Sequence, residues 1–137
     1  MKKQTIAIYP GSFNPFHEGH KEIVEKALLC FDKVIVAKGI NPNKNEAIQE
    51  GNIEIPEKAI FIQFTSLLSE FCNKNNATCI VKGLRNGIDM ENEMTQQEWN
   101  RQLGLTIPTF YIISNPEHRH ISSSAIRTLN LFRSKDK

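Results

Sequence analysis

Residues 5–20 read TIAIYPGSFNPFHEGH, and this stretch decides the fold that we expect. Its first five residues, 5–9, form a short β-prone run, and Pro10-Gly11 marks a break after them. A helical pattern then begins near Glu18 and places four apolar residues on one face, Ile23, Val24, Ala27 and Leu28. The stretch therefore predicts a strand, a glycine turn and a helix.

Four further strand-like runs alternate with helical patterns along the rest of the chain. They span residues 33–37, 59–62, 78–81 and 109–113. Such alternation indicates a Rossmann-like α/β fold, with a parallel five-stranded sheet and helices on both faces. In sheets of this kind, ligands bind beyond the carboxyl ends of the strands. We therefore expect the functional residues just after the strands.

Helical spacing continues at residues 67–71, 89–103 and 122–131. Thr65 or Ser66 is the predicted N-cap of the first of these helices. The chain of 137 residues is long enough for one domain, 1–137, which buries roughly two-thirds of its unfolded surface. The Lys-rich residues 133–137 are expected to fray.

Composition limits the classes of partner. A net charge of +2 is too small to indicate a nucleic-acid footprint, and no apolar run approaches the length of a membrane span. The N-terminus has no signal-peptide pattern, so we expect a cytoplasmic protein that binds neither nucleic acid nor membrane. The three cysteines, Cys30, Cys72 and Cys79, lack C-x-x-C spacing and are predicted to be core thiols of a reducing compartment.

His17 and His20 follow the first strand and its glycine turn. They are three residues apart at a helix start, so both rings can face one side. The free N–H groups of a helix N-terminus favour an anion, and two imidazoles there can donate to phosphate oxygens. We therefore favour a phosphate site over two surface histidines. A zinc site would need a third ligand nearby, and no metal-ligating residue is predicted.

A second phosphate-binding element is predicted at residues 121–127, ISSSAIR. Its three serines stand at the start of the last predicted helix, where one hydroxyl can serve as the N-cap. The surplus hydroxyl and N–H groups can hold a phosphate. Simple capping would explain this element if it stood alone, but beside the histidine pair we favour the phosphate role.

GSFNPFHEGH at 11–20 and ISSSAIR at 121–127 together resemble the HxGH nucleotidylyltransferase superfamily. Within it, three further segments are similar to bacterial phosphopantetheine adenylyltransferases. They are GINPNK at 39–44, KGLRN at 82–86 and DMENEM at 89–94. The resemblance covers nearly the whole chain, with the motifs in the family's order.

The resemblance implies transfer of AMP from ATP to 4′-phosphopantetheine, which yields dephospho-coenzyme A and pyrophosphate in coenzyme A biosynthesis. The acceptor phosphate is itself a competent nucleophile, so catalysis would consist of in-line positioning and charge stabilisation. Mg²⁺ would enter with the triphosphate of ATP and need few protein ligands. Members of this family are commonly hexameric, so a homo-oligomer is expected.

The resemblance also implies roles for single residues. His20, with His17 by position, would stabilise the charge on the α-phosphate, and Lys44 would hold the acceptor phosphate and bridge to the α-phosphate. Lys82 and Arg85 would neutralise phosphates. The implied ATP-binding residues are Ser12, Phe13, His20, Gly83, Leu84, Arg85, Glu93, His118, Arg119, His120, Ile121, Ser122, Ser123 and Ser124. The implied acceptor-binding residues are Ser12, Lys44, Leu67, Leu68 and Lys82.

The chain departs from the usual family pattern at several places. His17 stands where Thr is usual, Asn14 where Asp is usual, and Lys82 where Arg would offer bidentate geometry. Segment 45–58 is shorter than the family's, and the chain ends soon after the last predicted helix. Two alternatives therefore remain: transfer to another phosphate acceptor, such as nicotinate mononucleotide or glycerol phosphate, or a degenerate module that binds nucleotide or coenzyme A.

Overall fold

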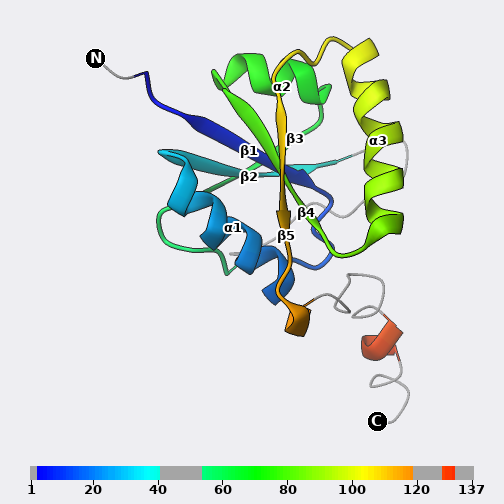
Figure 1. The fold of residues 1–137 in the computed structure, drawn as a ribbon. Coiled ribbons are helices and arrows are strands. Elements are labelled where there is room, and N and C mark those ends of the chain that lie inside the picture. Colours follow the sequence, from blue (N-terminus) through cyan, green and yellow to red (C-terminus); the bar gives the residue numbers. More distant parts are fainter. Residues whose placement is uncertain (1–2, 41–53, 119–127, 132–137) are drawn as a thin grey trace.

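The computed structural model describes residues 3–40, 54–118 and 128–131. It contains a five-stranded sheet in the order β3-β2-β1-β4-β5, with every neighbouring pair parallel (Figure 1). The strands are β1 (Ile6–Gly11), β2 (Lys33–Gly39), β3 (Ile60–Phe64), β4 (Cys79–Leu84) and β5 (Thr109–Ile113). The helices are α1 (Glu18–Cys30), α2 (Leu68–Lys74), α3 (Gly87–Gln102) and the short 3₁₀ turn η2 (Pro116–His118), and residues 128–131 are helical as well. The predicted Rossmann-like fold is thus confirmed.

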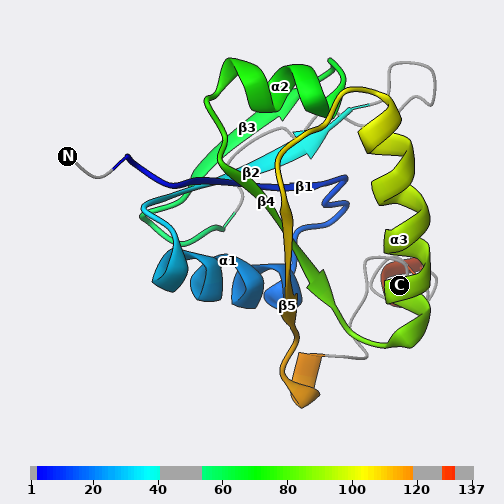
Figure 2. The same ribbon diagram turned by 45° about the horizontal axis from the view of Figure 1, so that its top comes forward.

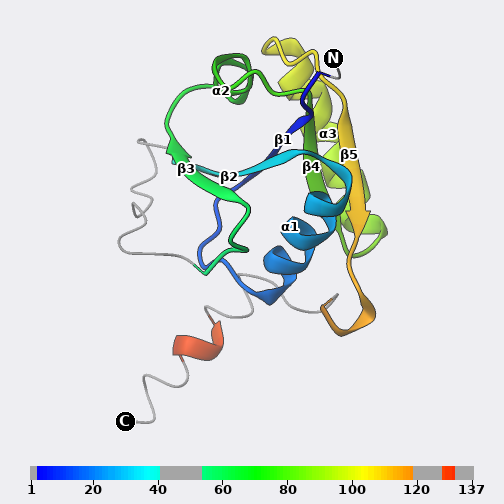
Figure 3. The same ribbon diagram turned by 90° about the vertical axis from the view of Figure 1, so that its left-hand side faces the viewer.

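Helices cover both faces of the sheet, as predicted. On one face, alternate strand residues such as Ala7 and Val81 pack with Ile23 and Val24 of α1. On the other face, Ile8, Ile35 and Ile80 pack with Phe71 and Cys72 of α2 and with Leu105, and Figures 2 and 3 show α1 and α2 on opposite sides of the sheet. The alternation is the two-residue period of a strand whose two faces are both buried.

Several element ends differ from the predictions. β1 continues through Pro10 and Gly11, which stay in register with β2, so the predicted break comes after Gly11. α3 begins at Gly87 because the side chain of Asn86 accepts a hydrogen bond from the N–H of Asp89 and caps the helix. The N-cap of α2 is Leu67, which makes no side-chain cap hydrogen bond, so the prediction of Thr65 or Ser66 was wrong.

The three cysteines have different environments. Cys72 and Cys79 are buried thiols, as predicted, whereas Cys30 is exposed. Cys30 is the last residue of α1, and both it and its neighbour Leu29 face away from the sheet. The prediction of a core thiol was therefore wrong for Cys30. No helix in the described ranges is both long and apolar enough to cross a bilayer.

Gly83 lets β4 approach α1 closely. A Cβ added to Gly83 would lie 2.9 Å from Cγ1 of Ile23, and the Ile23 side chain is only 2% exposed. Gly87, at the start of α3, offers a contrast because an added Cβ would meet nothing within 4 Å. The two glycines therefore differ in the space around them.

We predict that Gly83→Ala lowers the free energy of unfolding by about 1–3 kcal/mol, since Ile23 must leave its packed position. Gly87→Ala, the matched control, adds a methyl group in open space at a helix start and is expected to be neutral or stabilising by up to about 1 kcal/mol. Urea denaturation of both variants checks this. Equal losses at both positions would contradict the close approach of β4 to α1.

Candidate active site

The turn after β1 carries the first part of the site. Phe13 adopts a left-handed backbone conformation with φ of 43°, which costs a non-glycine residue about 1–3 kcal/mol. Its ring is buried against Tyr9 and His20, at centroid distances of 5.1 and 4.9 Å. From the end of β2, the buried ammonium of Lys38 donates a hydrogen bond to the carbonyl of Ser12. Packing and this hydrogen bond together fix the turn.

Two imidazoles cap the N-terminus of α1. Nδ1 of His17 accepts a hydrogen bond from the N–H of Gly19, and Nδ1 of His20 accepts one from the N–H of His17, both at 3.1 Å. The two rings stack with centroids 3.8 Å apart, so they face one side as predicted. Because each Nδ1 is an acceptor, the proton of each neutral ring lies on Nε2. Two Nε2–H donors are therefore presented at the start of the helix.

Both histidines are held in their neutral form. Burial lowers the pKa of His20 to about 3, with further lowering by His17 and Arg85. Burial also lowers the pKa of His17, with contributions from Arg85 and His118 that outweigh the opposing effect of Glu18. Near neutral pH these rings can therefore stabilise a developing negative charge by hydrogen-bond donation rather than by a positive charge of their own.

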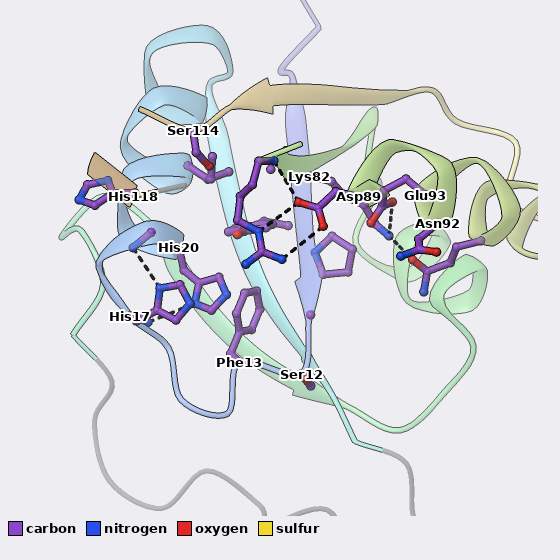
Figure 4. Close-up of a pocket in the computed structure, with 18 of the residues that line it drawn as sticks. Ser12, Phe13, His17, His20, Lys82, Asp89, Asn92, Glu93, Ser114 and His118 are labelled. Carbon is purple, nitrogen blue, oxygen red and sulfur yellow. Dashed lines mark hydrogen bonds and ion pairs between the residues drawn. The ribbon is translucent and has the colours of Figure 1, made fainter. Parts of the chain in front are cut away.

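Positive charge enters the site from the end of β4 (Figure 4). Nζ of Lys82 lies 2.9 Å from Oε2 of Glu93 and 2.7 Å from Oε1 of Gln96, both on α3. Nε of Arg85 lies 3.0 Å from Oδ2 of Asp89, also on α3. The two cations predicted to neutralise phosphates are thus each positioned by a carboxylate of the helix that follows them.

These groups line one cleft of about 680 Å³, a volume in the range of small-molecule sites. It lies between the turn after β1, the start of α1, the end of β4 and α3, and Figure 4 shows its lining side chains. The predicted site residues that line it are Ser12, Phe13, His17, His20, Leu68, Lys82, Gly83, Arg85, Glu93 and His118. Segments far apart in the sequence are therefore brought together at the carboxyl edge of the sheet, as expected.

Some predicted residues lie elsewhere. Leu67 is exposed and is not among the residues that line the cleft. Leu84 also does not line it, although its neighbours Gly83 and Arg85 do. The remaining predicted residues lie outside the described ranges: Lys44, Arg119, His120, Ile121, Ser122, Ser123 and Ser124.

The cleft also contains residues to which no role was predicted. One side of α3 contributes a polar stripe that includes, besides Glu93, residues Asp89, Asn92, Gln96 and Asn100. Their spacing of three or four residues is the signal that could have identified them, because it places them along one helix face. Tyr9 and Ser114 also line the cleft from the ends of β1 and β5.

The comparisons with known proteins agree with this geometry. Residues 8–129 match the model of the cytidylyltransferase-like family, so fold and site together define a nucleotidyltransferase. Three similar relatives are named phosphopantetheine adenylyltransferase. That of Clostridium perfringens is 37% identical over 93% of this chain and 82% of its own length. Those of Cytophaga hutchinsonii and Streptococcus pneumoniae are 36% and 33% identical, over 93% of this chain and 90% and 84% of their own lengths. The chain belongs to the phosphopantetheine adenylyltransferase family.

A solved structure supports the fold independently. The lipopolysaccharide core biosynthesis protein of Thermoplasma volcanium GSS1 matches 82% of this chain and 99% of its own with a TM-score of 0.55. Its sequence identity of 16% makes this a likeness of fold alone.

The low pKa of His20 predicts a pH dependence of stability. Its pKa is about 3 in the folded chain against 6.5 when unperturbed, so between these values the unfolded chain binds a proton that the folded chain does not. The free energy of unfolding is therefore undiminished by His20 above pH 6.5, and part of it is lost as the pH falls from 6.5 towards 3. Between pH 6.5 and 5 we expect the wild type to lose about 1.5 kcal/mol more than His20→Asn. Urea unfolding at both pH values checks this, and equal losses would contradict a buried neutral ring.

Proposed function

We propose that this protein transfers the AMP moiety of ATP to 4′-phosphopantetheine, forming dephospho-coenzyme A and pyrophosphate. One observation carries the proposal: the Nε2–H donors of His17 and His20 and the cations Lys82 and Arg85 line a single cleft. Neutral donors and paired cations around one cavity suit a reaction in which negative charge grows on a phosphoryl group.

In the proposed reaction, an oxygen of the acceptor phosphate attacks the α-phosphorus of ATP. The bond from the α-phosphorus to the oxygen that bridges to the β-phosphate breaks, and pyrophosphate leaves with the electron pair. Nε2–H of His20 donates to an oxygen of the α-phosphate, while Lys82 and Arg85 balance the charge of the phosphates. Since the acceptor oxygen is already anionic, the residues mainly align the two substrates.

The two substrates occupy different parts of the cleft in this proposal. The nucleoside lies against Gly83 and α3, where Glu93 and the polar stripe of that helix offer hydrogen bonds. The acceptor lies towards Leu68 at the start of α2. We propose that Lys44 and residues 119–124 also bind the phosphates, because the sequence motifs that contain them resemble those of the family.

We propose that Mg²⁺ accompanies the triphosphate. Within the described residues no group of three metal-ligating side chains is found, and the cleft carboxylates Asp89 and Glu93 are paired with Arg85 and Lys82. This donor set suits an ion held mainly by phosphate oxygens and water. When bound, the ion would neutralise charge on the triphosphate.

The acceptor is tested by pyrophosphate release from ATP and Mg²⁺ with three candidate acceptors: 4′-phosphopantetheine, nicotinate mononucleotide and glycerol 3-phosphate. We expect release only with phosphopantetheine. His20→Gln is the control for contaminating activity and is expected to reduce turnover by about 10²–10³-fold, as loss of a transition-state donor does. Release with another acceptor would contradict the proposed substrate, and no release with any of them would contradict the proposed reaction.

We also propose that the chain forms a homo-oligomer through α3. No residue of α3 is buried, and its apolar side chains Ile88 and Trp99 are 71% and 63% exposed. Their separation of 11 positions, about three turns, places them on the same side of the helix. Two exposed apolar side chains on the same side of a helix favour association.

Analytical ultracentrifugation tests this proposal. We expect the wild type to sediment as an oligomer and Trp99→Glu to dissociate it. Leu29→Glu is the matched control, because Leu29 is equally apolar and 87% exposed but belongs to α1. A monomeric wild type, or an equal effect of both substitutions, would contradict the assignment of α3 as the interface.

A further inference from the structure

Glu22 is a buried carboxylate whose position in α1 faces the end of β5. Its side chain is 6% exposed. Oε2 accepts a hydrogen bond from the N–H of Asn115 at 2.8 Å, and Oε1 lies 2.9 Å from Nδ1 of His118. Nζ of Lys26, one turn further along α1, lies 3.0 Å from Oε2. One carboxylate therefore joins α1 to the chain that leaves β5, and the reaction described above makes no use of it.

This carboxylate is ionised. Burial by itself would raise the pKa of Glu22, but hydrogen bonds from His118, Asn115 and Lys26 lower it below its usual value. Burying a charged group costs free energy unless hydrogen bonds and opposite charges compensate, and here all three partners do so. The buried carboxylate of Glu22 therefore holds the groups that bind it in nearly fixed positions.

His118 is the partner that reaches the cleft. It is the last residue of η2, and its side chain lines the cleft at the opposite end from Glu93 (Figure 4). It lies over the first turn of α1, since a Cβ added to Gly19 would be 4.0 Å from Cβ of His118. With Nδ1 directed to Glu22, Nε2 is the ring nitrogen left for a ligand.

The hydrogen bonds of His118 differ from those of the capping histidines. Nδ1 of His17 and Nδ1 of His20 accept from backbone N–H groups, whereas Nδ1 of His118 faces a carboxylate and therefore carries a proton. A ring that donates to the Glu22 carboxylate through Nδ1 and to a phosphate through Nε2 has a proton on both nitrogens. It can thus supply a positive charge that the capping histidines do not.

We propose that Glu22 is a positioning residue that holds His118 to bind the β- and γ-phosphates of ATP, the part that leaves as pyrophosphate. This rests on the nucleotide binding of the proposed function and extends it to a residue that does not line the cleft. The placement follows from the positions proposed above: the nucleoside lies at the α3 end of the cleft and the α-phosphate at His20, so the opposite end, where His118 lies, receives the rest of the triphosphate.

The test is calorimetric binding of ATP, inorganic pyrophosphate and AMP to the intact protein. We expect Glu22→Gln and His118→Gln each to weaken ATP and pyrophosphate binding about tenfold while changing AMP binding less than twofold. The double variant is expected to bind no more weakly than His118→Gln alone, because Glu22 acts through His118. Lys26→Met, the matched control, removes a charge that contacts the same carboxylate and is expected to change ATP binding less than twofold.

Three results would overturn the proposal: unchanged pyrophosphate affinity in His118→Gln, additive losses in the double variant, or equal weakening of ATP and AMP by Glu22→Gln. If Glu22→Gln does not fold, the pyrophosphate affinity of the half-buried His118→Gln decides alone. These titrations contain no acceptor, so an incorrect choice of acceptor would contradict the proposed function without affecting this result.

Discussion

The hydrogen bond by which the ring of His17 caps α1 both stabilises the fold and prepares the ring for its chemical role. A helix N-terminus must satisfy backbone N–H groups that have no partner within the helix, and His17 and His20 satisfy two N–H groups there through Nδ1. The same two hydrogen bonds decide which ring nitrogen carries the proton. Folding of the helix start therefore fixes the two Nε2–H donors before any ligand binds.

This capping has an electrostatic consequence for the cleft. Two neutral, stacked rings create no repulsion between them, so they can lie 3.8 Å apart beside the N-terminus of a helix. Positive charge comes instead from Lys82 in β4, the strand next to β1, and from Arg85, which directly follows β4. Because β1 and β4 pair in parallel, the histidine donors that follow β1 lie close to the cations at the end of β4. Carboxylates of α3 then keep those cations in place.

The sequence predicted the parts of this structure that depend on local pattern. The apolar run 109–113 matches β5 at both ends, and the three-residue spacing of His17 and His20 correctly places their rings on one side. Local pattern did not predict the features that depend on contacts between residues distant in the sequence. Leu67 instead of a polar residue precedes α2, and no spacing in the sequence reveals that Glu22 meets His118, which is 96 positions away.

The function of the cleft depends most directly on the protonation of the capping histidines, His17 and His20. The ¹⁵N nuclear magnetic resonance signals of the imidazole nitrogens measure this protonation, and the variants His17→Asn and His20→Asn assign the signals. At pH 7 we expect an unprotonated Nδ1 and a protonated Nε2 in both rings, and His20 is expected to remain neutral at pH 5, in keeping with its pKa of about 3. An imidazolium at pH 7, or a proton on Nδ1, would contradict the account of how this site binds and transfers a phosphoryl group.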